Sequence, residues 1–176
     1  MNTKYLTRAA IIAAIYAIGT YLLGSFGSGP IQVRITEVLA VLPFFDASAI
    51  LGVTVGCFIA NILGGLGPWD VFGGTFITFI AAILTNKSKS KLGAISWPIL
   101  LNAFGVSAYL SVIFKLPYWY NVVTIFIGQF ISIGVLGYPF MLYLEKNAQF
   151  LGLDNRKEYD VKLDSAGETD SKIDAK

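Results

Sequence analysis

The stretch from Gly29 to Phe45, GPIQVRITEVLAVLPFF, decides how this chain is interpreted. It places Arg34 and Glu37 three residues apart at the start of an apolar run, so a helix here puts both side chains on one face. An ionisable side chain at bilayer depth costs roughly 2.5–3.5 kcal/mol on insertion scales. We therefore expect the pair to face a polar cavity or a ligand. One alternative stays open, in which Arg34 only neutralises Glu37 and holds the loop.

The rest of the chain is as apolar as this stretch. Of its 176 residues, 55% are hydrophobic and 14% are charged, and the mean hydropathy is +0.66. A soluble domain carries about 25% charged residues, so these values predict an integral membrane protein of the cell membrane. The chain has no histidine and one cysteine, Cys57. We therefore expect no metal site, no catalytic site and no internal disulfide.

Apolar stretches of helical length predict an all-α integral membrane protein with six transmembrane helices, at 5–23, 34–45, 47–63, 71–85, 95–114 and 122–144. The second stretch is short for a full crossing. Most lysine and arginine residues fall on one side if the N terminus is inside, so both termini are predicted to be cytoplasmic. Residues 1–150 form the membrane domain. Residues 151–176 lose the apolar pattern and are predicted to be a disordered cytoplasmic tail.

This topology brings most polar and aromatic groups of the chain toward the outer face. A site there needs groups that hydrogen-bond to a ligand and rings that stack on it. Alternatives remain for two of them, because Trp69 suits a membrane-interface belt and Asp70 suits the N-cap of the fourth helix. The predicted substrate-binding residues are Arg34, Glu37, Asn61, Trp69, Asp70, Asn102, Tyr118, Trp119 and Gln129.

Two motifs limit the function further. Ala9, Ala13 and Ala17 form a ridge of small side chains that lets another helix approach closely, and spacing alone favours packing inside this chain. The glycine-rich segment 64–74, GGLGPWDVFGG, lacks the Gly-Lys-Ser/Thr ending of a phosphate-binding loop. We therefore expect no nucleotide hydrolysis and no cofactor in this chain.

The segments RITEVLAVLPFF and GLGPWD, with a last span ending in GYPF, resemble the QueT family. The resemblance covers roughly residues 7–144. It implies a substrate-binding S component of an energy-coupling factor (ECF) transporter, with an S-component-like bundle, for uptake of queuosine precursors. It also implies a coupling transmembrane subunit and two ATPase subunits as partners, with ATP hydrolysed by those subunits. On this basis Ala9, Ala13 and Ala17 are expected to dock the coupling subunit.

The resemblance implies a deazaguanine base as the ligand, which offers an aromatic face, a carbonyl and several N–H donors. Gln129 departs from the family pattern, where we expect a glutamate in many relatives. Three alternatives stay open: an S component for another vitamin-like heterocycle, a small channel and an intramembrane enzyme. A channel needs a ring of like polar groups along a through-path. An enzyme needs a nucleophile beside a base, and the sequence offers no obvious pair.

Overall fold

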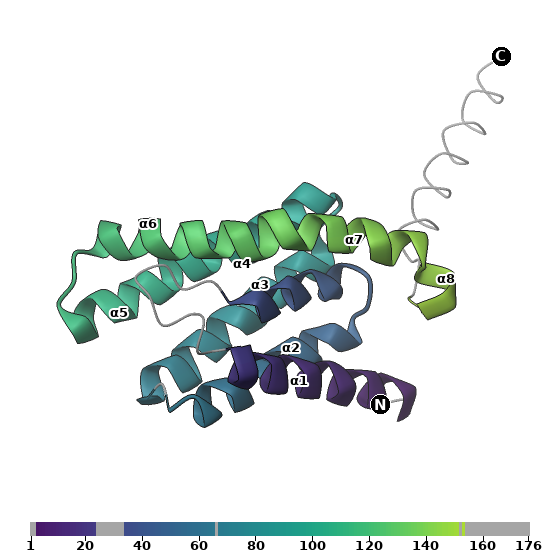
Figure 1. Ribbon diagram of the computed structural model, residues 1–176, viewed down its shortest axis with the longest axis horizontal. Helices are drawn as coiled ribbons and strands as arrows, with labels where there is room; N and C mark the ends of the chain where they lie inside the picture. Colours follow the sequence, from purple (N-terminus) through teal and green to yellow (C-terminus); the bar gives the residue numbers. More distant parts are fainter. Residues whose placement is uncertain (1–2, 24–33, 66, 152, 154–176) are drawn as a thin grey trace, which may run out of the picture.

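The computed structural model describes residues 3–23, 34–65, 67–151 and 153, and within these ranges it contains helices and no strand. Figure 1 shows the helices stacked side by side along one direction. In chain order they are α1 (Thr3–Leu23), η2 (Ile35–Phe44), α2 (Ser48–Leu63), η3 (Trp69–Gly74), α3 (Thr75–Lys87), α4 (Lys91–Leu101), η4 (Asn102–Val106), α5 (Ser107–Phe114), α6 (Tyr118–Gln129), η5 (Phe130–Leu136), α7 (Gly137–Lys146) and α8 (Ala148–Leu151).

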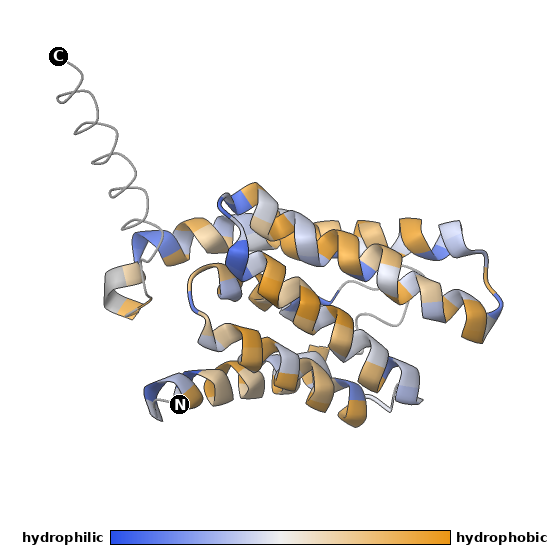
Figure 2. Ribbon diagram, turned by 180° about the vertical axis from the view of Figure 1, so that it is seen from behind, coloured by the Kyte–Doolittle hydropathy of each residue, from blue (hydrophilic) through white to orange (hydrophobic). Residues whose placement is uncertain are grey.

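Several of these elements join into longer helices. Among the described residues, four continuous helices are long and apolar enough to cross a membrane: Thr3–Leu23, Trp69–Lys87, Lys91–Ile113 and Tyr118–Lys146. The remaining apolar helices, η2 and α2, are shorter. Figure 2 shows hydrophobic residues along the helices and hydrophilic ones mostly toward their ends. The predicted all-helical membrane fold is confirmed, whereas six crossings stay a prediction.

The short second helix, η2, is wound as a 3-10 helix over ten residues. A 3-10 helix rises about 2.0 Å per residue against about 1.5 Å for an α-helix, so η2 covers about 20 Å where an α-helix would cover about 15 Å. The 3-10 geometry therefore makes this short segment longer than an α-helix with the same number of residues. Glu37 lies in the first turn of η2, and Arg34 directly precedes the helix with an extended backbone.

η2 lies in the middle of the fold and contacts α1, α2, α3, α4, α7 and η5. Its two faces enter two different hydrophobic clusters. Ala40 and Val41 pack with Ile95, Ile133 and other residues of the second half of the chain. Leu39 packs on the cluster that includes Tyr16 and Val53 from α1 and α2. The stretch that opened the sequence analysis is thus the element through which the two halves of the chain are joined.

The alanine ridge of α1 is buried inside this chain. Ala9, Ala13 and Ala17 are all buried, and Ala9 and Ala13 lie against α2. A Cβ added at Gly56 would lie 2.7 Å from Tyr16 Cβ and 3.0 Å from the Ala13 carbonyl oxygen, so the backbones approach as closely as small side chains allow. The expectation that this ridge docks a partner is therefore wrong, because α2 already covers it.

Charged side chains at the N-terminal end of α1 are paired. Arg8 forms an ion pair with Asp46 at 2.9 Å and donates to the Leu151 carbonyl oxygen at 3.3 Å. Lys91, at the start of α4, pairs with Glu145 near the end of α7 at 2.5 Å. These contacts gather the starts of α1 and α4 and the end of the chain's last long helix at one end of the bundle. Apart from Leu151 and Leu153, the predicted tail 151–176 lies outside the described residues.

Candidate functional site

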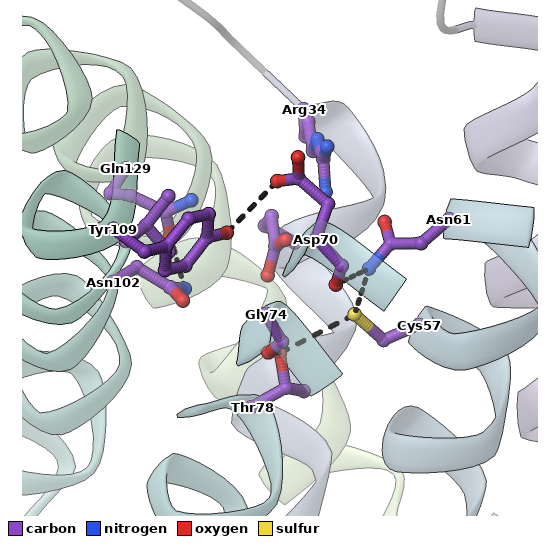
Figure 3. Close-up of a pocket in the computed structure, with 11 residues that line it drawn as sticks. Arg34, Cys57, Asn61, Asp70, Gly74, Thr78, Asn102, Tyr109 and Gln129 are labelled. Atoms are coloured by element: carbon purple, nitrogen blue, oxygen red, sulfur yellow. Dashed lines mark hydrogen bonds between the residues drawn. The ribbon is translucent and has the colours of Figure 1, made fainter. Parts of the chain in front are cut away.

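One small cavity lies among the helices, between the first and second halves of the chain. It measures about 40 Å³ and is lined by Arg34, Glu37, Cys57, Asn61, Asp70, Gly74, Thr78, Asn102, Val106, Tyr109 and Gln129. Figure 3 shows Asn102, Tyr109 and Gln129 on one side and Asn61, Asp70 and Cys57 on the other. At about 10–15 Å³ per water molecule, the cavity has room for about three waters. A heterocyclic ligand needs the walls to move apart.

Glu37 is the most informative residue of the lining. Only 3% of its surface is exposed, and its Oε1 accepts a hydrogen bond of 2.8 Å from the Tyr16 hydroxyl. Its Oε2 is buried and has no hydrogen-bond partner among the described residues. A buried polar atom without a partner costs about 1–3 kcal/mol, and more when it is charged. This oxygen is therefore a buried hydrogen-bond acceptor that no donor of the described residues satisfies.

α1 holds Glu37 in place through two contacts. Besides the Tyr16 bond, the hydroxyls of Thr20 and Thr36 lie 2.6 Å apart. Thr36 also packs so closely on α1 that a Cβ added at Gly19 would lie 2.7 Å from its methyl carbon. The start of η2 is thereby fixed against α1. Oε1 of Glu37 is occupied, while Oε2 has no partner in the part of the chain that the structure describes.

Asn61 provides a second acceptor of the same kind. Its Nδ2 donates to the Asp70 carbonyl oxygen at 2.8 Å and contacts Cys57 Sγ at 3.5 Å. Its Oδ1 is buried and, among the described residues, has no partner. The Thr78 hydroxyl lies 3.4 Å from the same sulfur, which completes a small polar group on this wall. The Asn61 amide nitrogen is thus hydrogen-bonded within the protein, whereas its amide oxygen has no donor among the described residues.

Arg34 and Glu37 both line the cavity, but within the described part of the chain they form no ion pair within 4 Å. A direct salt bridge between them, which the sequence left as an alternative, is therefore absent from this structure. Glu37 takes its hydrogen bond from Tyr16 instead. The guanidinium and the carboxylate thus contribute separately to the lining.

Asp70 has a different role from the predicted helix cap. It lies inside the helical run that begins before it, and the start of η3 has no side-chain cap hydrogen bond. Its Oδ1 accepts a hydrogen bond of 2.9 Å from the Tyr109 hydroxyl on α5, drawn across the cavity in Figure 3. Among the described lining side chains, this bond alone joins the two walls. Asp70 is therefore a wall residue that ties η3 to α5.

Asn102 and Gln129 complete the opposite wall. The Asn102 amide nitrogen donates to Gln129 Oε1 at 3.2 Å, and both side chains are buried. This pairing leaves the amide nitrogen of Gln129 and the amide oxygen of Asn102 as the second polar atoms of each group. The wall therefore offers one donor group and one acceptor.

Two π-helical segments line this cavity, and a third begins directly after a lining residue. Asp70 and Gly74 belong to η3, Asn102 and Val106 belong to η4, and Gln129 directly precedes η5. π-helical turns are rare and often occur at functional sites. Asp70, Gly74 and Thr78 follow one another at four-residue spacing. Four residues rotate slightly more than one full turn in an α-helix and slightly less than one full turn in a π-helix, so the two deviations cancel along η3 and α3. This keeps Asp70, Gly74 and Thr78 in one line facing the cavity.

The structure brings six of the nine predicted site residues to the cavity: Arg34, Glu37, Asn61, Asp70, Asn102 and Gln129. The three aromatic residues do not line it. Trp69 and Trp119 are 63% and 69% exposed. Tyr118 donates to the Phe104 carbonyl oxygen at 3.3 Å and packs edge-on against Trp119. These side chains therefore lie at the protein surface. For Trp69 this fits the alternative of a residue in the membrane-interface belt.

Sequence reasoning missed Tyr109, Tyr16 and the Cys57–Thr78 contact. Helical spacing would have found part of this, because Tyr109 follows Asn102 by seven residues and Cys57 precedes Asn61 by four. Tyr16 had no such signal, since its partner Glu37 lies on another helix. Among the described lining residues, Tyr109 is the one with an aromatic ring.

Comparisons with known proteins agree on one family. Residues 6–146 match the family described as QueT transporter. The Queuosine precursor transporter QueT of Lactococcus lactis subsp. cremoris (strain MG1363) is 41% identical over 64 residues, which cover 35% of this chain and 38% of that relative. No solved structure matches the chain significantly. A match to a transporter family, together with several apolar helices of spanning length, identifies a multi-pass membrane protein.

Proposed function

This chain belongs to the QueT transporter family, and on that premise we propose that it binds a queuosine precursor within the membrane for uptake. In this proposal it is the substrate-specific subunit of an ATP-driven importer of the ECF type. The ligand is a deazaguanine base, and the site is the cavity lined by Arg34 and by residues of η2, α2, η3, α3, η4, α5 and α6. The chain itself recognises the ligand, and partner subunits supply the energy.

One observation carries the proposal: buried polar atoms of Glu37 and Asn61 face the cavity and have no partner among the described residues. In an apolar helical protein such atoms are stabilised only when a ligand or water supplies donors. A deazaguanine base carries N–H donors on its ring and, in some forms, on its side arm, and these suit the two acceptors. Its carbonyl suits the amide nitrogen of Gln129.

The arrangement supports a binding subunit more than a channel or an enzyme. The lining residues are chemically varied, whereas a channel needs like groups repeated along a through-path. Among the described lining residues, the nucleophilic side chains of Cys57 and Thr78 are hydrogen-bonded to no base in the way that covalent catalysis needs. Binding is therefore the chemistry that these residues support best.

We place both termini and the basic residues on the cytoplasmic side, with six helical runs crossing the membrane. Support comes from the end of the bundle that holds Arg8, Lys91 and α8, where positive residues gather. For docking to a coupling subunit, the accessible face of α1 is the opposite flank, where Ala10, Ala14 and Ile15 are exposed. Two ATPase subunits complete the proposed importer.

Equilibrium binding by the purified chain tests the proposal. A deazaguanine base should bind the isolated protein without ATP, and ligand released from freshly purified protein should be a deazaguanine by mass spectrometry. Accumulation of the base in liposomes should require the partner subunits and ATP. Failure of every deazaguanine base to bind, or robust uptake by this chain alone, would overturn the proposal.

A further inference from the structure

The charged groups of the cavity do not balance. Among the described residues, its lining contains one cationic side chain, Arg34, and two carboxylates, Glu37 and Asp70. One positive against two negative groups leaves one net negative charge when all three are ionised. The segment 24–33, which precedes Arg34, contains no aspartate, glutamate, lysine or arginine that could change this sum.

An unbalanced charge in a cavity of low dielectric is costly unless a counter-charge enters or a carboxylate takes up a proton. Asp70 already accepts a hydrogen bond from Tyr109 and is partly exposed. Glu37 is almost fully buried, and its Oε2 has no donor among the described residues. The place where a cation gains most is therefore Glu37 Oε2.

The geometry of Glu37 also distinguishes between two ways of binding a base. A carboxylate that clamps the edge of a guanine-like ring uses both of its oxygens for two parallel N–H bonds. Here Tyr16 occupies Oε1 at 2.8 Å, so Glu37 presents one free oxygen. A single oxygen suits a point charge such as an ammonium group. Asn61 Oδ1 and the Asn102–Gln129 pair are then left to contact the ring.

We propose that this cavity selects a monocationic ligand, a deazaguanine whose side arm carries an ammonium group that contacts Glu37 Oε2. The inference rests on the proposed function and narrows it to one charge class of base. A neutral base with the same ring fits the ring contacts but leaves the cavity negatively charged. Tyr16 is a positioning residue in this account, because it fixes which oxygen of Glu37 faces the ligand.

Two bases with one ring provide the test. An aminomethyl-deazaguanine is cationic near pH 7, and a cyano-deazaguanine is neutral. Titration calorimetry on the purified full chain should give at least tenfold tighter binding of the aminomethyl base, equivalent to about 1.4 kcal/mol. Equal affinities, or tighter binding of the cyano base, would overturn the charge selection and leave the proposed function standing. Binding of neither base would overturn the proposed function as well.

The variant Glu37→Gln tests the contact itself. It should lower the affinity for the aminomethyl base by at least tenfold and change that for the cyano base by less than threefold. Glu145→Gln is the matched control, because it makes the same change at a carboxylate that pairs with Lys91 away from the cavity. An equal loss for both bases would overturn the contact. If Glu37→Gln does not fold, judged by its melting temperature, the wild-type comparison of the two bases decides.

Discussion

Arg8 and Asp46 lie 2.9 Å apart at one end of the bundle, and Lys91 and Glu145 are paired at the same end. Around the cavity the opposite holds. Glu37 has a buried oxygen without a partner, and no ion pair joins it to Arg34 within the described residues. Paired charges at the end of the bundle satisfy one another, whereas Glu37 in the cavity keeps an oxygen without a partner among the described residues. This contrast separates structural charges from those that, in the proposed function, contact a ligand.

The largest expected effect is at the cavity. Glu37→Gln keeps the shape of the side chain and removes its charge, so a charge-assisted contact worth about 1.5–3 kcal/mol is lost. Binding of an amine-bearing deazaguanine should weaken by roughly tenfold to more than a hundredfold. Affinity by calorimetry and melting temperature should be measured on one preparation. Unchanged affinity in a folded variant would remove Glu37 from the site and break the comparison.

The second effect concerns the packing of α1 on α2. Gly56→Ala places a Cβ 2.7 Å from Tyr16 Cβ, and overpacking of this kind costs about 1–3 kcal/mol. The melting temperature should fall. Gly73→Ala is the matched control, because its Cβ meets Tyr109 at an ordinary 3.5 Å. Equal melting temperatures for the two variants would contradict the close approach of the helices.

A third, smaller effect is expected where the two walls are joined. Tyr109→Phe removes the hydrogen bond to Asp70, whose net worth is about 0.5–1.5 kcal/mol. If the walls separate to admit a ligand, the association rate should rise by roughly twofold to tenfold. Stopped-flow tryptophan fluorescence measures this rate. A slower association would show that the bond helps to form the site instead of closing it.

The smallest effect belongs to the paired end. Glu145→Gln breaks a pair in which the Glu145 side chain is 54% exposed, and such pairs contribute about 0–1 kcal/mol. The melting temperature should change little, and ligand affinity should not change. A loss of affinity here would mean that the paired end of the bundle and the cavity are energetically coupled. The two groups of charges would then not act independently.

Part of this architecture was predictable from the sequence because it depends on local pattern. The apolar runs predicted the helices, and Arg34, Glu37, Asn61 and Asp70 stood out as polar groups within or beside them. The 3-10 winding of η2 was not predictable from an apolar period, which does not distinguish the two helix types. That winding places Glu37 within reach of Tyr16 on α1.

The remaining errors came from long-range packing. The Ala9–Ala13–Ala17 ridge has the same sequence pattern whether it meets α2 or another protein, and only the fold shows α2 against it. Trp69 and Trp119 were chosen for their chemistry, but their helices turn them outward. Tyr109 reaches Asp70 across 39 residues of sequence, so no local rule indicated the bond.

Cys57 offers the most direct test of where the ligand binds, because it is the single cysteine of the chain and lines the cavity. The rate of its alkylation by a membrane-permeable maleimide can be followed by intact-protein mass spectrometry, with and without an amine-bearing deazaguanine. A ligand in the cavity should slow the alkylation of wild-type protein at concentrations that saturate binding, and Glu37→Gln should need higher concentrations for the same protection. An alkylation rate that stays unchanged at saturating ligand would contradict the assignment of this cavity as the binding site.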